Sequence, residues 1–156
     1  MSEDSILCRK RILVVEDELI VAMDLQKRLT HLGYDVPLTA SSGDEAIQLV
    51  FETKPHLILM DIRLKGALDG IKTAQVIRDR FQTPVVYLTC YCDESTIERA
   101  KLTEPYGYLV KPFDERELKT TIEMALHRNQ KELERKEIMA RAIVDSSRAK
   151  APGSKS

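Results

Sequence analysis

The chain has 156 residues, 43% of them hydrophobic and 31% charged, with a formal net charge of −1. This length and composition predict one globular domain with a modest appendage, and the near-neutral charge gives no general attraction to nucleic acid or membrane. No apolar run approaches the roughly 20 residues that span a bilayer, and the polar first ten residues lack the apolar stretch of a signal peptide. We therefore expect a cytoplasmic protein without a membrane segment.

The first third of the chain predicts two strands and two helices. Residues 11–15 form a short β-branched run, and apolar residues at helical spacing follow it as far as Gly33, which we expect to end the first helix. Residues 34–39 predict a second strand. The sequence from Ser42 to Glu45 has the form of a capping box and predicts the start of a second helix.

The remainder continues the alternation of strands and helices. Three more strands are predicted from short apolar runs at residues 57–60, 84–88 and 106–110. The helices after them are expected to open at Asp69, at Asp93 or Ser95, and at Asp114. Strand and helix thus alternate five times, which predicts an α/β domain with a five-stranded parallel sheet, helices on both faces and an extended C-terminal helix.

Residues whose side chains can take part in catalysis or ion binding lie where the predicted strands end. Glu16 and Asp17 follow the first strand, Asp61 ends the third, Thr89 ends the fourth and Lys111 follows the fifth. Alone, each is ordinary, since an Asp often caps a helix, a Thr favours strands and a Lys-Pro pair is common in surface loops. In a parallel sheet, however, the carboxyl ends of the strands meet at one edge. We therefore expect three carboxylates, one hydroxyl and one ammonium around a single crevice.

This combination indicates phosphoryl chemistry. Three adjacent carboxylates repel one another, and Mg²⁺ prefers a site of one or two carboxylates with room for water and a phosphate oxygen. Lys111 has the wrong sign for a simple cation site, and we expect it to hold an anion to which Thr89 also donates a hydrogen bond. Aspartate is a known nucleophile in the formation of aspartyl phosphate.

Taken together, these residues resemble the receiver domains of two-component response regulators. The likeness covers about residues 10–126 and rests on these segments: Glu16-Asp17 after the first strand, Leu59-Met60-Asp61, Tyr87-Leu88-Thr89, Tyr108, and Lys111-Pro112-Phe113. It implies the flavodoxin-like strand order 2-1-3-4-5. The segments 61–71 and 100–107 are similar to those of receivers found ahead of sensor and kinase modules.

The resemblance also implies a role for each residue. Asp61 would be the phosphoacceptor, with Thr89 and Lys111 contacting the phosphoryl oxygens. Mg²⁺ would be the cofactor, and its ligands would be Asp17, Asp61, the backbone carbonyl of Arg63 and, through water, Glu16. Thr89 and Tyr108 would form the switch, and the Lys111–Pro112 bond would be cis. The phosphoryl donor would be a sensor histidine kinase, a phosphotransfer protein or a small acyl phosphate, and the output would be a downstream protein partner.

The chain is expected to divide into four parts. Residues 1–9 would be a leader, 10–126 the receiver domain, 127–147 a helical extension or linker, and 148–156 a disordered tail. Leu126, Leu133 and Ala140 are spaced by seven residues, a thin heptad seam that leaves a solvated helix, homodimerisation and linkage to another domain all open. The residues after 126 are too few for a DNA-binding domain.

Four other functions are alternatives to a switching receiver. An aspartate-nucleophile phosphatase usually has a second Asp two residues after the nucleophile, where this chain has Arg63, so we do not expect an enzyme that turns over foreign substrates. A flavin-binding flavodoxin-like protein needs a phosphate loop where this chain has Glu16, Asp17 and Glu18. A phosphoryl carrier without a switch output remains an alternative, whereas a scaffold that lacks the chemistry does not explain why every reactive position is filled.

Overall fold

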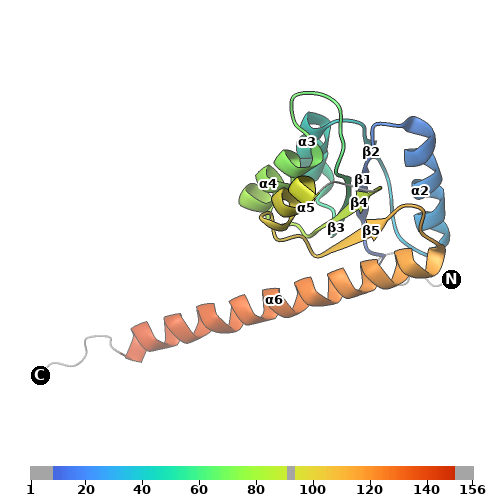
Figure 1. Cartoon of the computed structure of the whole chain (residues 1–156). Helices are drawn as coiled ribbons and strands as arrows, with labels where there is room; N and C mark the ends of the chain where they lie inside the picture. The colour runs from blue at the N-terminus through green and yellow to red at the C-terminus, as the bar shows by residue number, and fades with distance from the viewer. Residues whose placement is uncertain (1–8, 91–93, 150–156) are drawn as a thin grey trace, which may run out of the picture.

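The computed structural model describes residues 9–90 and 94–149, which form ten helices and strands. The strands are β1 (Ile12–Val15), β2 (Thr39–Ala40), β3 (Leu57–Asp61), β4 (Val85–Thr89) and β5 (Gly107–Val110). The helices are α2 (Leu19–His31), α3 (Gly43–Thr53), α4 (Gly70–Phe81), α5 (Glu94–Lys101) and α6 (Glu115–Ala149). Strand and helix alternate along the chain, as the periodicity predicts (Figure 1).

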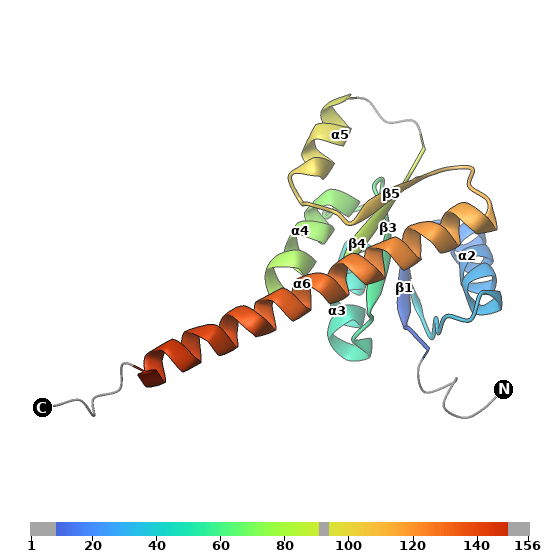
Figure 2. The same cartoon turned by 90° about the horizontal axis from the view of Figure 1, so that it is seen from below.

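All five strands are parallel and lie in the order β2-β1-β3-β4-β5. The predicted parallel sheet and its flavodoxin-like order are therefore confirmed. Helices α2 and α6 cover one face, and α3, α4 and α5 cover the other (Figures 1 and 2). Both faces are covered, so the central strands are largely apolar up to their last residues, and β1 and β4 are buried at every position.

Successive residues of a central strand pack into two different hydrophobic cores. On β3, Ile58 and Met60 belong to the cluster under α3, α4 and α5, while Leu57 and Leu59 belong to the cluster under α2 and α6. This alternation follows from the two-residue period of a strand. The second cluster also contains Leu118, Ile122 and Ala125, which anchor the first part of α6 on the sheet.

The second strand is shorter than predicted and lies later in the chain. Residues 34–39 were expected to be extended in the sheet, but β2 is Thr39–Ala40, and before it only Asp35 forms an isolated bridge, with Arg11. Pro37 has no N–H to donate to a ladder, and the carbonyl oxygen of Val36 accepts from the side chain of Gln26 at 2.8 Å. Val36 and Pro37 thus do not take part in the expected strand pairing, whereas Asp35 still exchanges backbone hydrogen bonds with Lys10 and Ile12.

The helix termini follow the predicted signals. The side chains of Ser42, Asp69 and Asp114 accept hydrogen bonds from backbone N–H groups three residues later, the usual N-cap geometry. Gly33 follows α2 with φ of +99°, a conformation that glycine adopts without a steric penalty. Asp93, one of the two predicted openings of α5, lies outside the described residues, and the helix is described from Glu94.

The final helix runs well past the sheet. It is 35 residues long and continues through residues 148 and 149, which were expected to belong to the tail. Its first part packs on the sheet beside α2, and the rest projects away from the domain (Figures 1 and 2). None of the described helices is both long and apolar enough to cross a membrane.

Candidate functional site

The strand register brings the predicted site residues to one edge of the sheet. Val15 on β1 pairs with Met60 on β3, so Glu16 and Asp17 come level with Asp61. Asp61 in turn pairs with Leu88 on β4, one residue before Thr89, and Thr89 pairs with Val110 on β5, one residue before Lys111. The five residues thus surround the carboxyl ends of neighbouring strands, as expected for an open α/β sheet.

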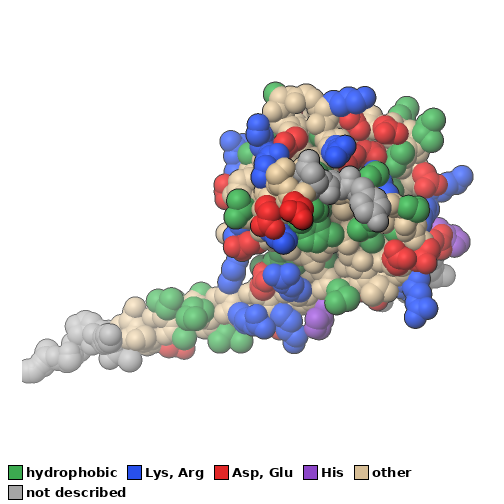
Figure 3. Space-filling model, viewed as in Figure 1, with side chains coloured by type: hydrophobic (Ala, Val, Ile, Leu, Met, Phe, Trp, Pro, Cys, Tyr) green, Lys and Arg blue, Asp and Glu red, His purple; other side chains and the backbone are tan. Residues whose placement is uncertain are grey.

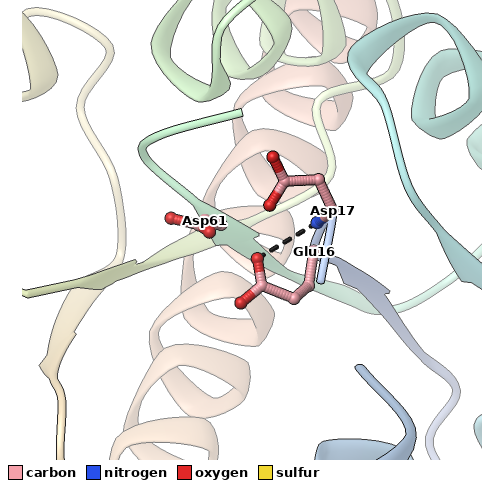
Figure 4. A group of neighbouring side chains, drawn as sticks. All are labelled: Glu16, Asp17 and Asp61. Atoms are coloured by element: carbon pink, nitrogen blue, oxygen red, sulfur yellow. Dashed lines mark hydrogen bonds between the residues drawn. The ribbon is translucent and has the colours of Figure 1, made fainter. Parts of the chain in front are cut away.

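Three carboxylates form the centre of the site (Figure 4). One carboxylate oxygen from each of Glu16, Asp17 and Asp61 lies within 4.8 Å of the others. Glu16 is only 2% exposed, while Asp17 and Asp61 are half-buried. Three hard oxygen donors at this spacing suit a small divalent cation, because a bound cation would reduce the repulsion between the carboxylates. The donor set therefore fits Mg²⁺.

Burial and neighbouring charge act strongly on Glu16. Burial of its side chain, with the adjacent carboxylate of Asp61, raises the pKa of Glu16 to about 7, although the nearby Lys111 ammonium opposes this rise. Lys111 Nζ donates to Glu16 Oε1 at 3.1 Å and lies 3.8 Å from Asp61 Oδ2. Burial lowers the pKa of Lys111, but the carboxylates of Asp61 and Glu16 outweigh it and the net pKa is raised. Lys111 is therefore a fixed cation beside the predicted phosphoacceptor.

Backbone N–H groups orient each carboxylate. The N–H of Asp17 donates to Glu16 Oε2 at 3.1 Å, the contact drawn in Figure 4. The N–H of Lys65 donates to Asp17 Oδ2 at 3.3 Å, and that of Arg63 donates to Asp61 Oδ1 at 3.0 Å. The loop after β3 thus holds two of the three carboxylates. Lys65 was not among the predicted site residues, and since it acts through its backbone, its side-chain type carried no signal.

Gly70 is a second contributor that sequence reasoning did not identify as part of the site. A Cβ at this position would lie 2.0 Å from the carbonyl oxygen of Asp61, so no other residue fits without a shift of the backbone. The N–H of Gly70 also donates to the carbonyl oxygen of Ile62 at 3.1 Å. The start of α4 is therefore packed directly against the end of β3, which fixes the position of Asp61. The sequence feature that could have indicated this role is the glycine directly after the capping residue Asp69.

The predicted switch residues lie on β4, which pairs with the strand of Asp61, and on β5 beyond it. Thr89 is 5% exposed, and its hydroxyl donates to the carbonyl oxygen of Cys90 at 2.6 Å. Tyr108, on β5, is partly exposed, and its ring centroid lies 6.0 Å from that of Tyr87 on β4. Tyr87 is fully buried, and its hydroxyl lies 2.6 Å from that of Thr103. The predicted cis bond between Lys111 and Pro112 is present.

Comparison with known proteins identifies a family that matches most of the chain. The family model described as the response regulator receiver domain matches residues 12–123. A transcriptional regulatory protein, PdtaR of Mycobacterium tuberculosis (strain CDC 1551 / Oshkosh), is 37% identical over 119 residues, which cover 76% of this chain and 58% of the relative. A probable transcriptional regulator of Porphyra purpurea, ycf27, is 35% identical over 126 residues, covering 79% of this chain and 50% of the relative. The chain thus spans about half the length of these curated relatives.

Solved structures with the same fold are also similar in sequence. One is the signal receiver domain of a modulated diguanylate cyclase from Desulfovibrio desulfuricans G20, with a TM-score of 0.76 and 38% identity. That match covers 80% of this chain and 98% of the other. Another is the N-terminal domain of a response regulator/sensory box/GGDEF three-domain protein from Carboxydothermus hydrogenoformans, with a TM-score of 0.73 and 36% identity, covering 80% and 99%.

Proposed function

Because the chain belongs to the response regulator receiver domain family of two-component signalling, we propose that it accepts a phosphoryl group on Asp61 and changes a partner-binding surface in response. One observation carries the proposal. Asp61 is half-buried at the edge of the sheet, beside two further carboxylates and 3.8 Å from the Lys111 ammonium. That arrangement combines a nucleophile, a cation-binding cluster and a fixed positive charge for an anion.

Asp61 is the only nucleophile in the proposed transfer. One carboxylate oxygen of Asp61 forms a bond to phosphorus as the bond from phosphorus to the donor breaks, and the donor leaves with that electron pair. The donor is a phosphorylated histidine of a kinase or phosphotransfer protein, or a small acyl phosphate. The hydrogen bond from the Arg63 N–H to Asp61 Oδ1 holds the carboxylate in one orientation and leaves Oδ2 on the side of Lys111.

Each of the three carboxylates has a role in the proposed cation site. Mg²⁺, when bound, neutralises the negative charge that accumulates on the transferring phosphoryl group. Asp17 and Asp61 would hold the ion directly, Glu16 through water, and the carbonyl oxygen of Arg63 would supply another ligand. The burial of Glu16 supports an indirect role, as does the engagement of both its oxygens, because Oε1 accepts from Lys111 and Oε2 accepts from the Asp17 N–H.

Lys111 and Thr89 would stabilise the phosphorylated state. The Lys111 ammonium can turn from Asp61 Oδ2 to a phosphoryl oxygen with little movement, since it lies within 4 Å of the carboxylate that carries the group. The Thr89 hydroxyl can exchange its bond to the Cys90 carbonyl for one to a phosphoryl oxygen. That rotation would leave space behind β4, and the partly exposed ring of Tyr108 could move inward to fill it.

The surface around β5 would carry the output to a downstream protein. Tyr108 and Val110 are exposed on the same strand, beside α6. A switch of this kind needs two states only a few kcal/mol apart, because one phosphoryl group must reverse their populations. We further propose that the receiver domain spans residues 10–126, that the rest of α6 links it to a partner or a further domain, and that the protein acts in the cytoplasm.

The proposal is tested by phosphorylation with a small acyl phosphate, followed by intact mass. The protein should gain the mass of one phosphoryl group in the presence of Mg²⁺. Chelation of the metal should abolish the gain, and restoration of Mg²⁺ should recover it. Labelling that is unaffected by chelation would contradict the proposed cation site, and the absence of labelling with every acyl phosphate and cognate kinase would contradict the phosphoacceptor function.

A further inference from the structure

The loop between β5 and α6 carries Lys111, and the effect of this ammonium on Asp61 depends on where the loop holds it. Acidic and basic side chains are intermixed on the face of the molecule shown in Figure 3, so no patch of one sign supplies a general positive field there. Lys111 Nζ lies 3.8 Å from Asp61 Oδ2, which is long for an ion pair. A displacement of about 1 Å would therefore change how well Lys111 stabilises a phosphoryl group on Asp61.

The backbone of this loop is held from two sides. The N–H of Lys111 donates to the carbonyl oxygen of Thr89 at 2.8 Å, which ties the loop to β4. Two residues later, the carbonyl oxygen of Phe113 accepts a hydrogen bond from Arg28 Nη2 at 3.0 Å. Arg28 belongs to α2, which lies beside the start of α6 (Figures 1 and 2). The second bond therefore ties the loop to a helix from a distant part of the sequence.

Arg28 contacts the ring of Phe113 as well as its carbonyl group. The guanidinium carbon lies 5.2 Å from the ring centroid, within the range of a cation–π interaction. The side chain of Arg28 is only 24% exposed, and Phe113 packs against the core under α2 and α6. Arg28 Nη1 also lies 3.8 Å from Asp24, but this carboxylate is 63% exposed and such a pair contributes little. The main contacts of Arg28 are thus with one residue of the loop.

We propose that Arg28 is a positioning residue for phosphoryl transfer, a role that rests on the function proposed above. By holding Phe113, it fixes the path of the loop and keeps the Lys111 ammonium beside Asp61. Among the described residues, no hydrogen bond or ion pair joins Arg28 to Lys111 or to the three carboxylates of the site. Its effect on the reaction therefore passes through the loop, and without it Lys111 Nζ would spend part of the time farther from Asp61.

Gln26 offers a matched comparison for a purely structural contact. It lies on the same helix, is half-buried as Arg28 is, and donates through Nε2 to the carbonyl oxygen of Val36 at 2.8 Å. The segment that it holds is next to Asp35, which pairs with Lys10 and Ile12 at the amino end of β1. That end of the sheet is opposite to the site. Loss of the Gln26 contact should therefore affect stability without affecting the reaction.

The test is the rate at which a small acyl phosphate with Mg²⁺ phosphorylates the full chain, followed by intact mass. Arg28→Met should slow the reaction by about tenfold, because the ammonium is present but displaced. Arg28→Lys keeps a donor for the Phe113 carbonyl but loses the planar group over the ring, and should be about threefold slower than wild type. Gln26→Met should react at the wild-type rate. Circular dichroism in urea measures the folded fraction, and if Arg28→Met does not fold, the comparison of Arg28→Lys with Gln26→Met decides.

A double-mutant cycle separates positioning of Lys111 from any independent effect of Arg28. In a Lys111→Met background, Arg28→Met should cause no further slowing, because there is no ammonium left to position. Effects that multiply in the double variant would overturn the proposal, since Arg28 would then act by a route that does not include Lys111. Arg28 variants that react as fast as Gln26→Met, in a protein whose wild type is labelled, would also overturn it. A wild type that is not labelled would instead contradict the proposed function, and with it the role of Arg28.

Discussion

Lys111 Nζ donates to Glu16 Oε1 at 3.1 Å and lies within 4 Å of Asp61. The pair joins the ends of β1 and β5, which are separated in the sheet by β3, the strand that carries the proposed phosphoacceptor, and by β4. The link holds a cation beside Asp61 before any phosphoryl group arrives. Preorganised charge of this kind lowers a barrier because it need not be rearranged during the reaction.

The first prediction follows from this contact. Lys111→Met should slow phosphorylation by about 100-fold, the usual effect of removing one fixed group that stabilises developing negative charge. The rate is measured from the growth of the phosphorylated mass under acyl phosphate. Lys101→Met removes a lysine that pairs with Glu98 on α5, outside the site, and should leave the rate unchanged. Equal rates for the two variants would mean that Lys111 does not act on the phosphoryl group.

The second prediction separates the two acidic residues after β1. Asp17→Asn should weaken Mg²⁺ binding more than Glu16→Gln, because a direct ligand contributes more to affinity than a carboxylate that acts through water. Titration calorimetry on the purified proteins measures both affinities, with the exposed Asp24→Asn as the control. If Glu16→Gln binds Mg²⁺ more weakly than Asp17→Asn, the assignment of the direct ligand is reversed.

The third prediction concerns the switch. Thr89→Ala should still accept the phosphoryl group, because Asp61 and the acidic cluster are intact, but it should lose the remote conformational change. NMR with a beryllofluoride mimic of the phosphoryl group should show wild-type shifts at Asp61 and across residues 94–126. In the variant, only those near Asp61 should remain. Remote shifts that persist without the hydroxyl would favour a phosphoryl carrier in which Thr89 has no signalling role.

The fourth prediction concerns stability at acid pH. Burial, together with the charges of Lys10 and Arg11, lowers the pKa of His56 below its ordinary 6.5. The folded protein therefore binds this proton less readily than the unfolded chain, and stability is lost as the pH falls below about 6.5. His56→Asn keeps an acceptor for the Arg11 N–H, which donates to His56 Nδ1 at 2.9 Å, but does not titrate. Between about pH 7 and about pH 5, the free energy of unfolding of this variant in urea should fall less than that of wild type. Equal pH dependence of the two free energies of unfolding would contradict the prediction.

Much of this architecture could be predicted from local pattern. Apolar runs separated by helical periodicity imply a parallel sheet, and a parallel sheet places Asp17, Asp61 and Lys111 at one edge wherever the helices lie. The capping residues Ser42, Asp69 and Asp114 located three helix starts, because a side-chain acceptor is needed where backbone N–H groups lack partners.

The missed features depend on contacts that no local pattern encodes. The extended segment after Gly33 is apolar enough for a strand, yet Pro37 and the bond from Gln26 to the Val36 carbonyl remove it from the ladder. The need for glycine at position 70 arises from a carbonyl nine residues earlier in the chain. The length of α6 was visible from its composition, but which of its faces would remain uncovered depends on where the sheet ends.

The central claim is that Asp61 is the phosphoacceptor, and peptide mapping of the phosphorylated protein tests it most directly. After reaction with acyl phosphate and Mg²⁺, reduction of the acyl phosphate with borohydride should mark one residue, and fragmentation should place that mark on Asp61. Asp61→Asn should acquire no phosphoryl group, because an amide is not a comparable nucleophile, whereas the exposed Asp24→Asn should be labelled as wild type is. Labelling of Asp61→Asn to the wild-type extent, or a mark on any other carboxylate, would contradict the account.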